Sequence, residues 1–452
     1  MKPNIILINC DDLGYGDLGA YGSIRNDTPH LDRLAREGKR FTDFYAGSPV
    51  CSASRASLMT GCYPPRVGIE GVLFPGDDIG LDPQEQTLAK QLKRAGYATQ
   101  IVGKWHCGDQ PEFLPTRHGF DHYFGLPYSN DMGRQIGRED DPPLPLLRDE
   151  TVAQKQPDQR GLTERYVHEC TQFIEAHRDQ PFFLYLAHMY VHVPIFVPPQ
   201  FLARSRNGGY GGAVACIDWS VGVILDTLDR LSLDDNTLVI FTSDNGSRAR
   251  GEGGSNDPMR GHKGQTWEGG QRVPCRMRWP GQITPDTTCE AVARQLDLYP
   301  TLSSLVGVDH PDPDARPIDG VDLSDLVFDD ETTGANNTMC YFWKNQLEAV
   351  RVGDWKLHFR KLDEPISALY HLRDDAGEQH NRIDDHPDVA KRLSAFAQTI
   401  RQTLGDSATG HDGQQRRPPG RVEHPQPLTA YREDHPYIVA MYDTPDMPTM
   451  VG

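Results

Sequence analysis

Four short apolar runs, rich in β-branched and aromatic residues, each lead into a cluster of polar side chains. They span residues 4–9, 98–102, 181–187 and 237–242. Continuous apolar strands of this kind are typical of a parallel sheet that is buried on both faces. Between the runs, apolar residues recur at spacings of three and four, which predicts helices over residues 29–38, 85–96, 163–177 and 213–231.

This alternation of strands and helices predicts an α/β fold, in which a large domain has a mostly parallel mixed sheet flanked by helices. Ligands of such folds bind beyond the carboxyl ends of the strands. We therefore expect the polar clusters that follow the four runs to meet at one edge of the sheet.

The pattern changes after about residue 335. Residues 347–359 predict a hairpin that turns at Gly353-Asp354, and residues 388–404 predict an amphipathic helix. Seven prolines in residues 406–452 exclude regular secondary structure from most of that stretch. We therefore predict an α/β domain (1–335), a small C-terminal α+β subdomain with an antiparallel sheet and a helix (336–405), and a proline-rich tail that wraps the surface (406–452).

Composition narrows the class of protein. The 452 residues carry a formal charge of −18, which disfavours non-specific binding to nucleic acid or to anionic membranes. We predict no membrane span, because no long uninterrupted apolar run occurs. The first strand follows Met1-Lys2-Pro3 directly, so we expect either a cytoplasmic protein or a periplasmic or secreted one whose leader has been removed. Nine scattered cysteines suggest neither a disulfide framework nor a CxxC metal site.

Two of the polar clusters offer hard oxygen ligands. Asp11 and Asp12 follow the first run, and Asp244 and Asn245 follow the fourth. Carboxylate and amide oxygens suit calcium or magnesium better than zinc. Each pair alone is an ordinary turn sequence, but together, at the ends of two parallel strands, they favour a metal site.

Cations and histidines complete the candidate site. Cys51 and Arg55 lie one turn apart at a predicted helix start, where backbone N–H groups favour an anion. Lys104 and Lys263 could also bind a tetrahedral anion, and Lys263 lies in a glycine-rich stretch typical of a functional loop.

Three histidines follow the second and third runs. His106 and His192 could transfer protons. His188 is a second candidate beside His192, although a structural role at the end of its strand suits it better.

These motifs, in this order, resemble the type I sulfatases, formylglycine-dependent enzymes of the alkaline phosphatase superfamily. The similarity is greatest to the branch of arylsulfatase A and N-acetylgalactosamine-6-sulfatase. The matching motifs are Cys51-Ser52-Ala53-Ser54-Arg55 with Leu58, Thr60 and Gly61, Asp11-Asp12, Gly103-Lys104-Trp105-His106, His192, Asp244-Asn245-Gly246 and Lys263-Gly264.

The resemblance implies that a formylglycine-generating maturase oxidises Cys51 to formylglycine. One hydroxyl of the hydrated aldehyde would attack sulfur, and the other would then expel sulfate. The resemblance also implies that Asp11, Asp12, Asp244 and Asn245 bind Ca²⁺, and that Asp244 activates the attacking hydroxyl.

Roles for the remaining residues follow from the same resemblance. Arg55 and Lys104 would hold the nucleophile and the sulfate, whereas Lys263 and His192 would bind the ester oxygen. His192 would protonate the leaving alcohol, and His106 would accept a proton in the second step.

The resemblance suggests a sulfated saccharide, of galactose type, as substrate. Two alternatives stay open at this point. One is a phosphodiesterase or phosphonate monoester hydrolase that uses the same nucleophile, and the other is a non-catalytic glycan-binding protein in which Cys51 is not converted.

Overall fold

The sheet that the four apolar runs predict lies at the centre of the structure. A computed structural model describes residues 2–135, 138–309, 316–329, 337–362 and 364–428, together with the strand Ile438–Val439. The four runs form strands that pair in parallel in the order β10, β1, β9, β5. Their bounds are β1 Asn4–Cys10, β5 Ala98–Gly103, β9 Phe182–Ala187 and β10 Thr237–Ser243.

Further strands extend this sheet on both sides to eleven, in the order β12-β2-β11-β10-β1-β9-β5-β6-β7-β8-β19. β11 is antiparallel to β10 and β2, and β7 is antiparallel to β6 and β8. The prediction of a mostly parallel mixed sheet flanked by helices is therefore confirmed. The added strands are β2 Lys39–Phe41, β6 His122–Gly125, β7 Pro145–Arg148, β8 Thr151–Lys155, β11 Cys275–Arg278, β12 Thr287–Cys289 and β19 Ile438–Val439.

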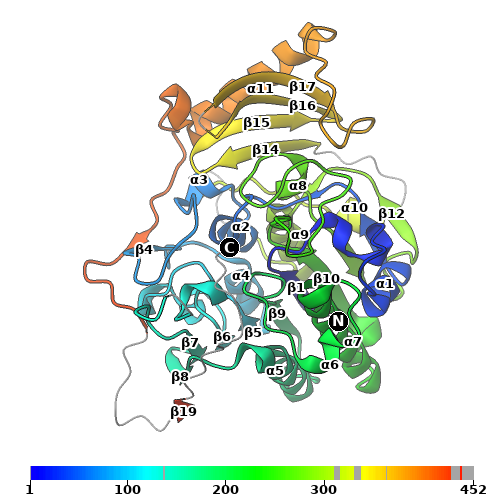
Figure 1. The fold of residues 1–452 in the computed structure, drawn as a ribbon, viewed down its shortest axis with the longest axis vertical. Coiled ribbons are helices and arrows are strands. Elements are labelled where there is room, and N and C mark those ends of the chain that lie inside the picture. Colours follow the sequence, from blue (N-terminus) through cyan, green and yellow to red (C-terminus); the bar gives the residue numbers. More distant parts are fainter. Residues whose placement is uncertain are drawn as a thin grey trace.

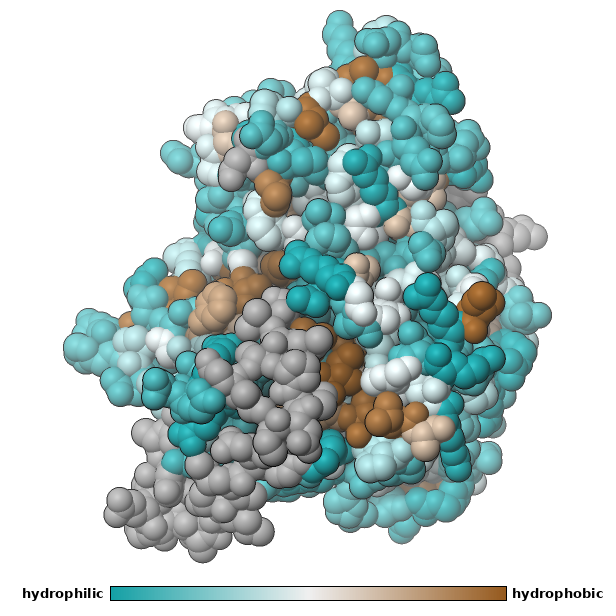
Figure 2. All heavy atoms as spheres, in the orientation of Figure 1, coloured by the Kyte–Doolittle hydropathy of each residue, from teal (hydrophilic) through white to brown (hydrophobic). Residues whose placement is uncertain are grey.

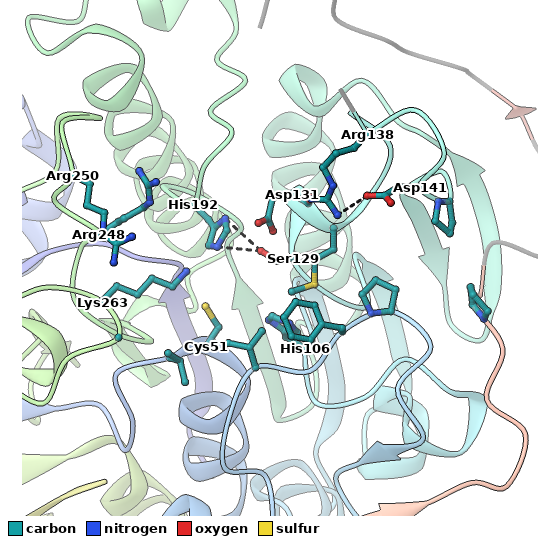
Figure 3. Close-up of a pocket in the computed structure, with 18 of the residues that line it drawn as sticks. Cys51, His106, Ser129, Asp131, Arg138, Asp141, His192, Arg248, Arg250 and Lys263 are labelled. Atoms are coloured by element: carbon teal, nitrogen blue, oxygen red, sulfur yellow. Dashed lines mark hydrogen bonds and ion pairs between the residues drawn. The ribbon is translucent and has the colours of Figure 1, made fainter. Parts of the chain in front are cut away.

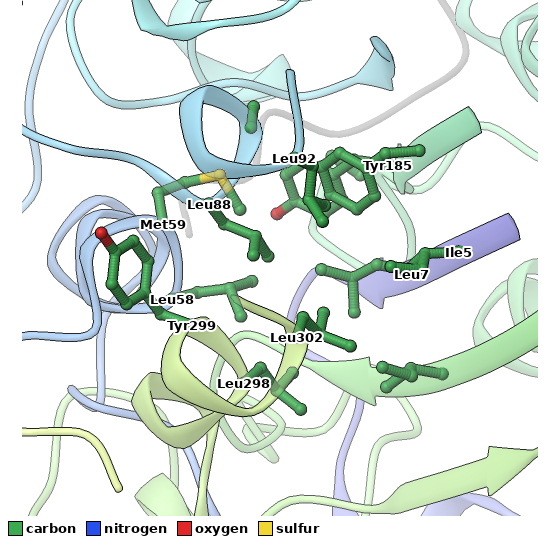
Figure 4. Close-up of a cluster of buried hydrophobic side chains, with 14 of the residues drawn as sticks. Ile5, Leu7, Leu58, Met59, Leu88, Leu92, Tyr185, Leu298, Tyr299 and Leu302 are labelled. Carbon is green, nitrogen blue, oxygen red and sulfur yellow. The ribbon is translucent and has the colours of Figure 1, made fainter. Parts of the chain in front are cut away.

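Helices cover both faces of the sheet because the side chains of each strand alternate between them. Ile5 and Leu7 face one cluster, which is covered by α2, α4 and α9 (Figures 1 and 4). Ile6 and Ile8 face the other cluster, with α1, α5 and α7. The six helices are α1 Pro29–Arg36, α2 Cys51–Thr60, α4 Leu88–Arg94, α5 Leu162–Ala176, α7 Gly208–Arg230 and α9 Leu298–Val306.

Helix α7 begins at Gly208, five residues before the predicted start, since its early glycines permit close packing. A Cβ atom on Gly212 would lie 2.8 Å from Val197, and one on Gly222 would lie 2.7 Å from His30. α7 has the length and hydropathy of a membrane span, but 78% of its most apolar window is buried inside the protein. Its apolar composition is accounted for by this core position.

A second sheet stands apart from the first and is drawn at the top of Figure 1. Its strands run in the order β14-β15-β16-β17, all antiparallel, and the hairpin between β15 and β16 turns at Gly353-Asp354, as predicted. Helix α11 packs on this sheet through Leu393 and Ala397. The elements are β14 Thr338–Trp343, β15 Gln346–Val352, β16 Trp355–Lys361, β17 Glu364–His371 and α11 Pro387–Leu404.

The described part of the C-terminal tail crosses the large domain. The guanidinium of Arg417 bonds Glu85 at 2.6 Å, and β18 (Gly420–Arg421) pairs with β4 (Ile79–Gly80). Apart from β19, the predicted tail beyond residue 428 lies outside the described residues. The face seen in Figure 2 is largely hydrophilic, with smaller apolar groups between.

The remaining elements are short, and among them β13 pairs with β3 and β18 with β4. The strands and α-helices among them are β3 Phe44–Tyr45, α3 Pro64–Val67, β4 Ile79–Gly80, α6 Pro199–Leu202, α8 Glu268–Gln271, β13 Ala293–Arg294, α10 Ser324–Phe328 and β18 Gly420–Arg421. The 3₁₀ helices are Tyr15–Asp17, Gly19–Tyr21, Pro111–Phe113, Pro115–His118, Asn130–Met132, Gln159–Gly161, Asp234–Asn236, Gln295–Asp297 and Ser407–Thr409.

Candidate active site

Cys51 is the first residue of α2 and lies buried beside the end of β1. Its Sγ donates to Oδ1 of Asp11 at 3.3 Å. Burial raises the pKa of the Cys51 thiol well above its usual range, and the nearby Asp11 and Asp244 carboxylates raise it further. The sulfur is therefore a neutral thiol at neutral pH, whereas nucleophilic cysteines act as thiolates.

The acidic residues that follow β1 and β10 form one buried group. The backbone N–H of Asp12 donates to Oδ1 of Asp244 at 3.2 Å, and Nδ2 of Asn245 donates to Oδ1 of Asp12 at 2.7 Å. Nδ2 of Asn245 also donates to the carbonyl of Gly246, which leaves the buried Oδ1 of Asn245 without a hydrogen-bond partner among the described residues. A buried acceptor beside three carboxylates fits a bound cation with oxygen ligands.

Three cations face these three carboxylates, of which Arg55 and Lys104 are buried and Lys263 is partly buried. Nζ of Lys104 bonds Asp11 at 2.6 Å, and Nζ of Lys263 bonds Asp12 at 3.0 Å. Arg55 donates from Nε to Oδ2 of Asp244 at 2.9 Å, and a terminal guanidinium nitrogen lies 2.8 Å from the same oxygen. The site is thus charge-balanced before a substrate or a metal enters.

The two central aspartates differ in acidity. Burial alone would raise the pKa of Asp11, but Lys104, His192 and Arg55 hold it well below its usual range. Burial and the adjacent Asp11 raise the pKa of Asp244 to about 7, although Arg55 opposes the change. A cation between the two carboxylates would favour the ionised form of both.

His192 and His106 both line the cavity wall near Cys51. His192 Nδ1 donates to the carbonyl of Val193 at 2.6 Å, and His192 Nε2 lies 3.8 Å from Oδ2 of Asp12. His106 Nε2 bonds the carbonyl of Leu73 at 3.0 Å, and its buried Nδ1 has no hydrogen-bond partner within the described ranges. Burial lowers both pKa values, with Lys263 adding to the effect on His192 and Lys104 to that on His106.

Backbone conformation supports this arrangement. Asp12 and His106 have φ angles of +62° and +60°, a left-handed conformation that is uncommon outside glycine and that concentrates at functional sites. Glycine is required just before Lys104, because a Cβ on Gly103 would lie 1.9 Å from the carbonyl oxygen of Ala187.

The structure brings together all ten residues named from the sequence. They are Asp11, Asp12, Cys51, Arg55, Lys104, His106, His192, Asp244, Asn245 and Lys263. Asp11, Asp12, Cys51 and His192 also form a cluster in which one potential ligand atom of each lies within 4.8 Å of the others. His188 does not line the cavity; its Nδ1 accepts from the backbone N–H of Tyr190 at 3.1 Å.

A cavity of about 700 Å³ opens above Cys51 and has walls that the sequence did not predict (Figure 3). Ser129 accepts from Lys104 at 3.2 Å and lies 3.3 Å from His192 Nε2, so it bridges the two sides of the site. No motif marks Ser129, because its position depends on the fold. Other lining residues outside the predicted set include Phe74, Asp131, Met132, Arg138, Arg248, Arg250 and Trp343.

Comparison with known proteins identifies the family. Residues 3–308 match the Sulfatase family. The chain belongs to the sulfatase family. Residues 262–404 also match the C-terminal region of N-sulphoglucosamine sulphohydrolase. The resemblance drawn from the motifs is therefore confirmed.

This sulfatase has extensive similarity to mammalian members. It is 38% identical to arylsulfatase A of Bos taurus over 86% of this chain and 85% of that one. It is 40% identical to N-acetylgalactosamine-6-sulfatase of Canis lupus familiaris over 79% and 72%. Among solved structures, Ps i-CgsB in complex with k-i-k-neocarrahexaose superposes with a TM-score of 0.82 at 29% identity, covering 93% and 96%. The protein is thus a sulfuric ester hydrolase.

The second sheet of this sulfatase helps to hold the loop that carries Lys263. Glu268, at the start of α8, accepts from Lys356 Nζ at 2.9 Å and from Tyr341 at 2.8 Å. Lys356 also donates to the carbonyl of Thr266 at 2.9 Å. Burial opposes ionisation of Glu268, but Lys356 and two arginines lower its pKa to about 2. The family match that begins at residue 262 therefore spans a loop and a sheet that are bonded to each other.

Proposed function

We propose that this sulfatase hydrolyses a sulfate monoester of a saccharide, with residue 51 as formylglycine and a calcium ion held by Asp11, Asp12, Asp244 and Asn245. A formylglycine-generating maturase would act on Cys51. The saccharide is favoured because N-acetylgalactosamine-6-sulfatase acts, by its name, on a sulfated sugar, and because Ps i-CgsB was solved with a neocarrahexaose.

One observation carries the proposal. Cys51 lies at the floor of the cavity as a neutral thiol, against three carboxylates and three cations. A neutral thiol in this place is a poor nucleophile. Formylglycine at the same position supplies, once hydrated, a hydroxyl that attacks sulfur and a second hydroxyl that releases the product.

The four oxygen-ligand residues suit calcium by their chemistry and by the orphaned Oδ1 of Asn245. When bound there, calcium supplies positive charge that polarises a sulfate oxygen. Arg55 and Lys104 already lie against Asp244 and Asp11, so they can hold the sulfate and orient residue 51.

The leaving group belongs on the side of His192 and Lys263. Burial opposes the charged form of Lys263, but Asp12 raises its pKa, so it remains a cation that can bind the ester oxygen. His192 donates its Nδ1 proton to Val193, so its Nε2 is left to exchange a proton with the leaving alcohol. Across the site, Nδ1 of His106 has no hydrogen-bond partner among the described residues and can accept a proton from residue 51 during sulfate release.

Mass spectrometry of the peptide that contains residue 51 tests the modification directly. Protein produced together with a maturase is expected to lose the cysteine sulfur and gain the formylglycine mass. The same preparation should hydrolyse 4-nitrophenyl sulfate in preference to a 4-nitrophenyl phosphonate ester. Retention of the thiol in an active preparation would refute the formylglycine, and preference for the phosphonate would refute the sulfate assignment.

Removal of calcium is expected to lower the rate of sulfate-ester hydrolysis by about 100-fold or more, since charge placed at the sulfate lowers the barrier. Activity should return on addition of CaCl₂. An independent reading is the melting temperature, which should rise with CaCl₂ because the ion binds the folded chain. Unchanged activity and melting temperature in protein shown by elemental analysis to be metal-free would contradict the assignment.

A further inference from the structure

Two arginines on the cavity wall, Arg248 and Arg250, have no part in the site described so far. Both line the cavity, and Figure 3 shows them on the same side as Lys263 and His192. Arg250 is exposed, and its guanidinium has no hydrogen-bond or ion-pair partner in the described part of the chain. An arginine that faces a ligand cavity without a carboxylate partner is available to an anion.

Arg248 is only partly neutralised. Its Nη1 lies 3.5 Å from Oε2 of Glu252, and this oxygen also accepts from the backbone N–H of Arg250 at 2.9 Å. Its Nε is buried and has no hydrogen-bond partner among the residues that the structure describes. Glu252 can therefore offset at most one of the two guanidinium charges, and the two arginines keep a positive surplus.

The loop that carries both arginines is fixed by its own hydrogen bonds. The Asn256 side chain accepts from the N–H of Ser247 at 2.8 Å and donates to its carbonyl at 2.9 Å. The same carbonyl accepts from the backbone N–H of Lys263 at 3.0 Å. Arg248, the next residue, is thus held at a fixed place beside the lysine loop.

The surplus of positive charge is confined to the cavity wall that Arg248 and Arg250 form. On the facing side of the cavity Arg138 is paired with Asp141 at 2.5 Å. The whole chain carries a formal charge of −18, so two incompletely paired arginines at one cavity wall run against its general charge. A cavity wall with a surplus of one sign of charge attracts a ligand group of the other sign.

We propose that Arg248 and Arg250 bind a second anionic group, a sulfate or a carboxylate, of the saccharide whose scissile sulfate reaches residue 51. This inference rests on the proposed function and narrows its substrate class to polyanionic saccharides. Phe74, Met132 and Trp343 line the same cavity and supply apolar surface for the sugar rings between the two anions.

Binding measured without turnover tests the proposal. Isothermal titration of the full-length Cys51→Ala protein would compare N-acetylgalactosamine 6-sulfate with its 4,6-disulfate, and glucosamine 6-sulfate with its 2-N,6-O-disulfate. A third pair, a uronic-acid-containing disaccharide 6-sulfate and its carboxyl-reduced form, distinguishes a carboxylate from a sulfate as the second anion. In at least one pair the more anionic ligand is expected to bind about tenfold or more tightly, with a preference that shrinks in high salt.

The variants assign that preference to the two arginines. The double variant Arg248→Gln/Arg250→Gln should reduce the ratio of the two affinities within a pair to about one. Arg250→Lys should retain part of the preference for the more anionic ligand. Arg178→Gln, an exposed arginine outside the cavity, is the matched control and should leave it intact. Equal affinities within every pair, absence of binding, or a preference that survives in the double variant would each overturn the proposal. Because no hydrolysis is measured, failure of the proposed function is detected separately, by the assay with 4-nitrophenyl sulfate.

Discussion

Cys51→Ala is expected to lower kcat/KM for sulfate-ester hydrolysis by about 10⁴-fold or more, because the residue that becomes the nucleophile is lost. The fold should survive. The Cys51 side chain donates to Asp11 at 3.3 Å and lies at the wall of a cavity, where truncation leaves no sealed void. The measurements are steady-state kinetics with 4-nitrophenyl sulfate and the melting temperature.

Cys62→Ala supplies the matched control for this substitution. Cys62 is also buried and follows the same helix, but its thiol bonds the carbonyl of Thr60 at 3.4 Å, away from the cavity. The control should keep its activity while losing some stability to the small cavity. Activity in Cys51→Ala at more than a few percent of the parent would exclude a nucleophile at this position.

The strand ends explain why so much of the site could be predicted from the sequence. Asp11, Lys104, His192 and Asp244 each follow a buried apolar strand closely, and parallel strands end at one edge of the sheet. The apolar pattern of the strands, together with the position of these residues after them, therefore predicts that the four side chains lie close together. Cys51 lies beside these residues because it is the first residue of α2, which begins at the same edge of the sheet.

Other parts of the site depend on contacts between distant segments, which no local pattern records. Ser129 bridges Lys104 and His192 from a stretch without a readable motif. Arg248 and Arg250 also carry no signal in the sequence, because two arginines in a glycine-rich stretch are typical surface residues, and only the fold places them at a cavity. Nothing in the local sequence around Glu268 indicates that it bonds Lys356 of the second sheet.

Helix boundaries show the same limit. The spacing of apolar residues predicts that α7 starts at residue 213, yet its first turns include four glycines, a residue that disfavours helices. At the N-terminus of α4, by contrast, local chemistry is decisive. Thr87 caps the helix by accepting from the N–H of Lys90 at 3.2 Å, which moves the start three residues beyond the predicted position.

Arg55→Ala is expected to lower kcat/KM by about 10³-fold and the free energy of unfolding by about 3–5 kcal/mol, because a buried carboxylate loses its partner. Arg55 is 1% exposed, contacts Asp244 at 2.8 and 2.9 Å and donates to the carbonyl of Lys104 at 2.7 Å. Arg55→Lys, which keeps the charge but not the forked geometry, should recover most of the stability and little of the activity. Urea unfolding and kinetics at saturating calcium measure the two effects.

The loss of activity in Arg55→Ala should be larger than its loss of stability explains, because the substitution also raises the pKa of Asp244. Burial and Asp11 already raise its pKa to about 7 with Arg55 in place. Without the arginine the pKa rises further, so at neutral pH more of the carboxyl is protonated and calcium binds less tightly. The activity of Arg55→Ala should therefore recover in part as pH or calcium concentration increases. Arg66→Ala, which breaks a partly buried pair with Asp319 at 2.6 Å away from the cavity, should lose stability but keep the parent's activity per folded molecule and its calcium dependence. Equal calcium dependence in Arg55→Ala and Arg66→Ala would show that Arg55 serves the fold and not the site.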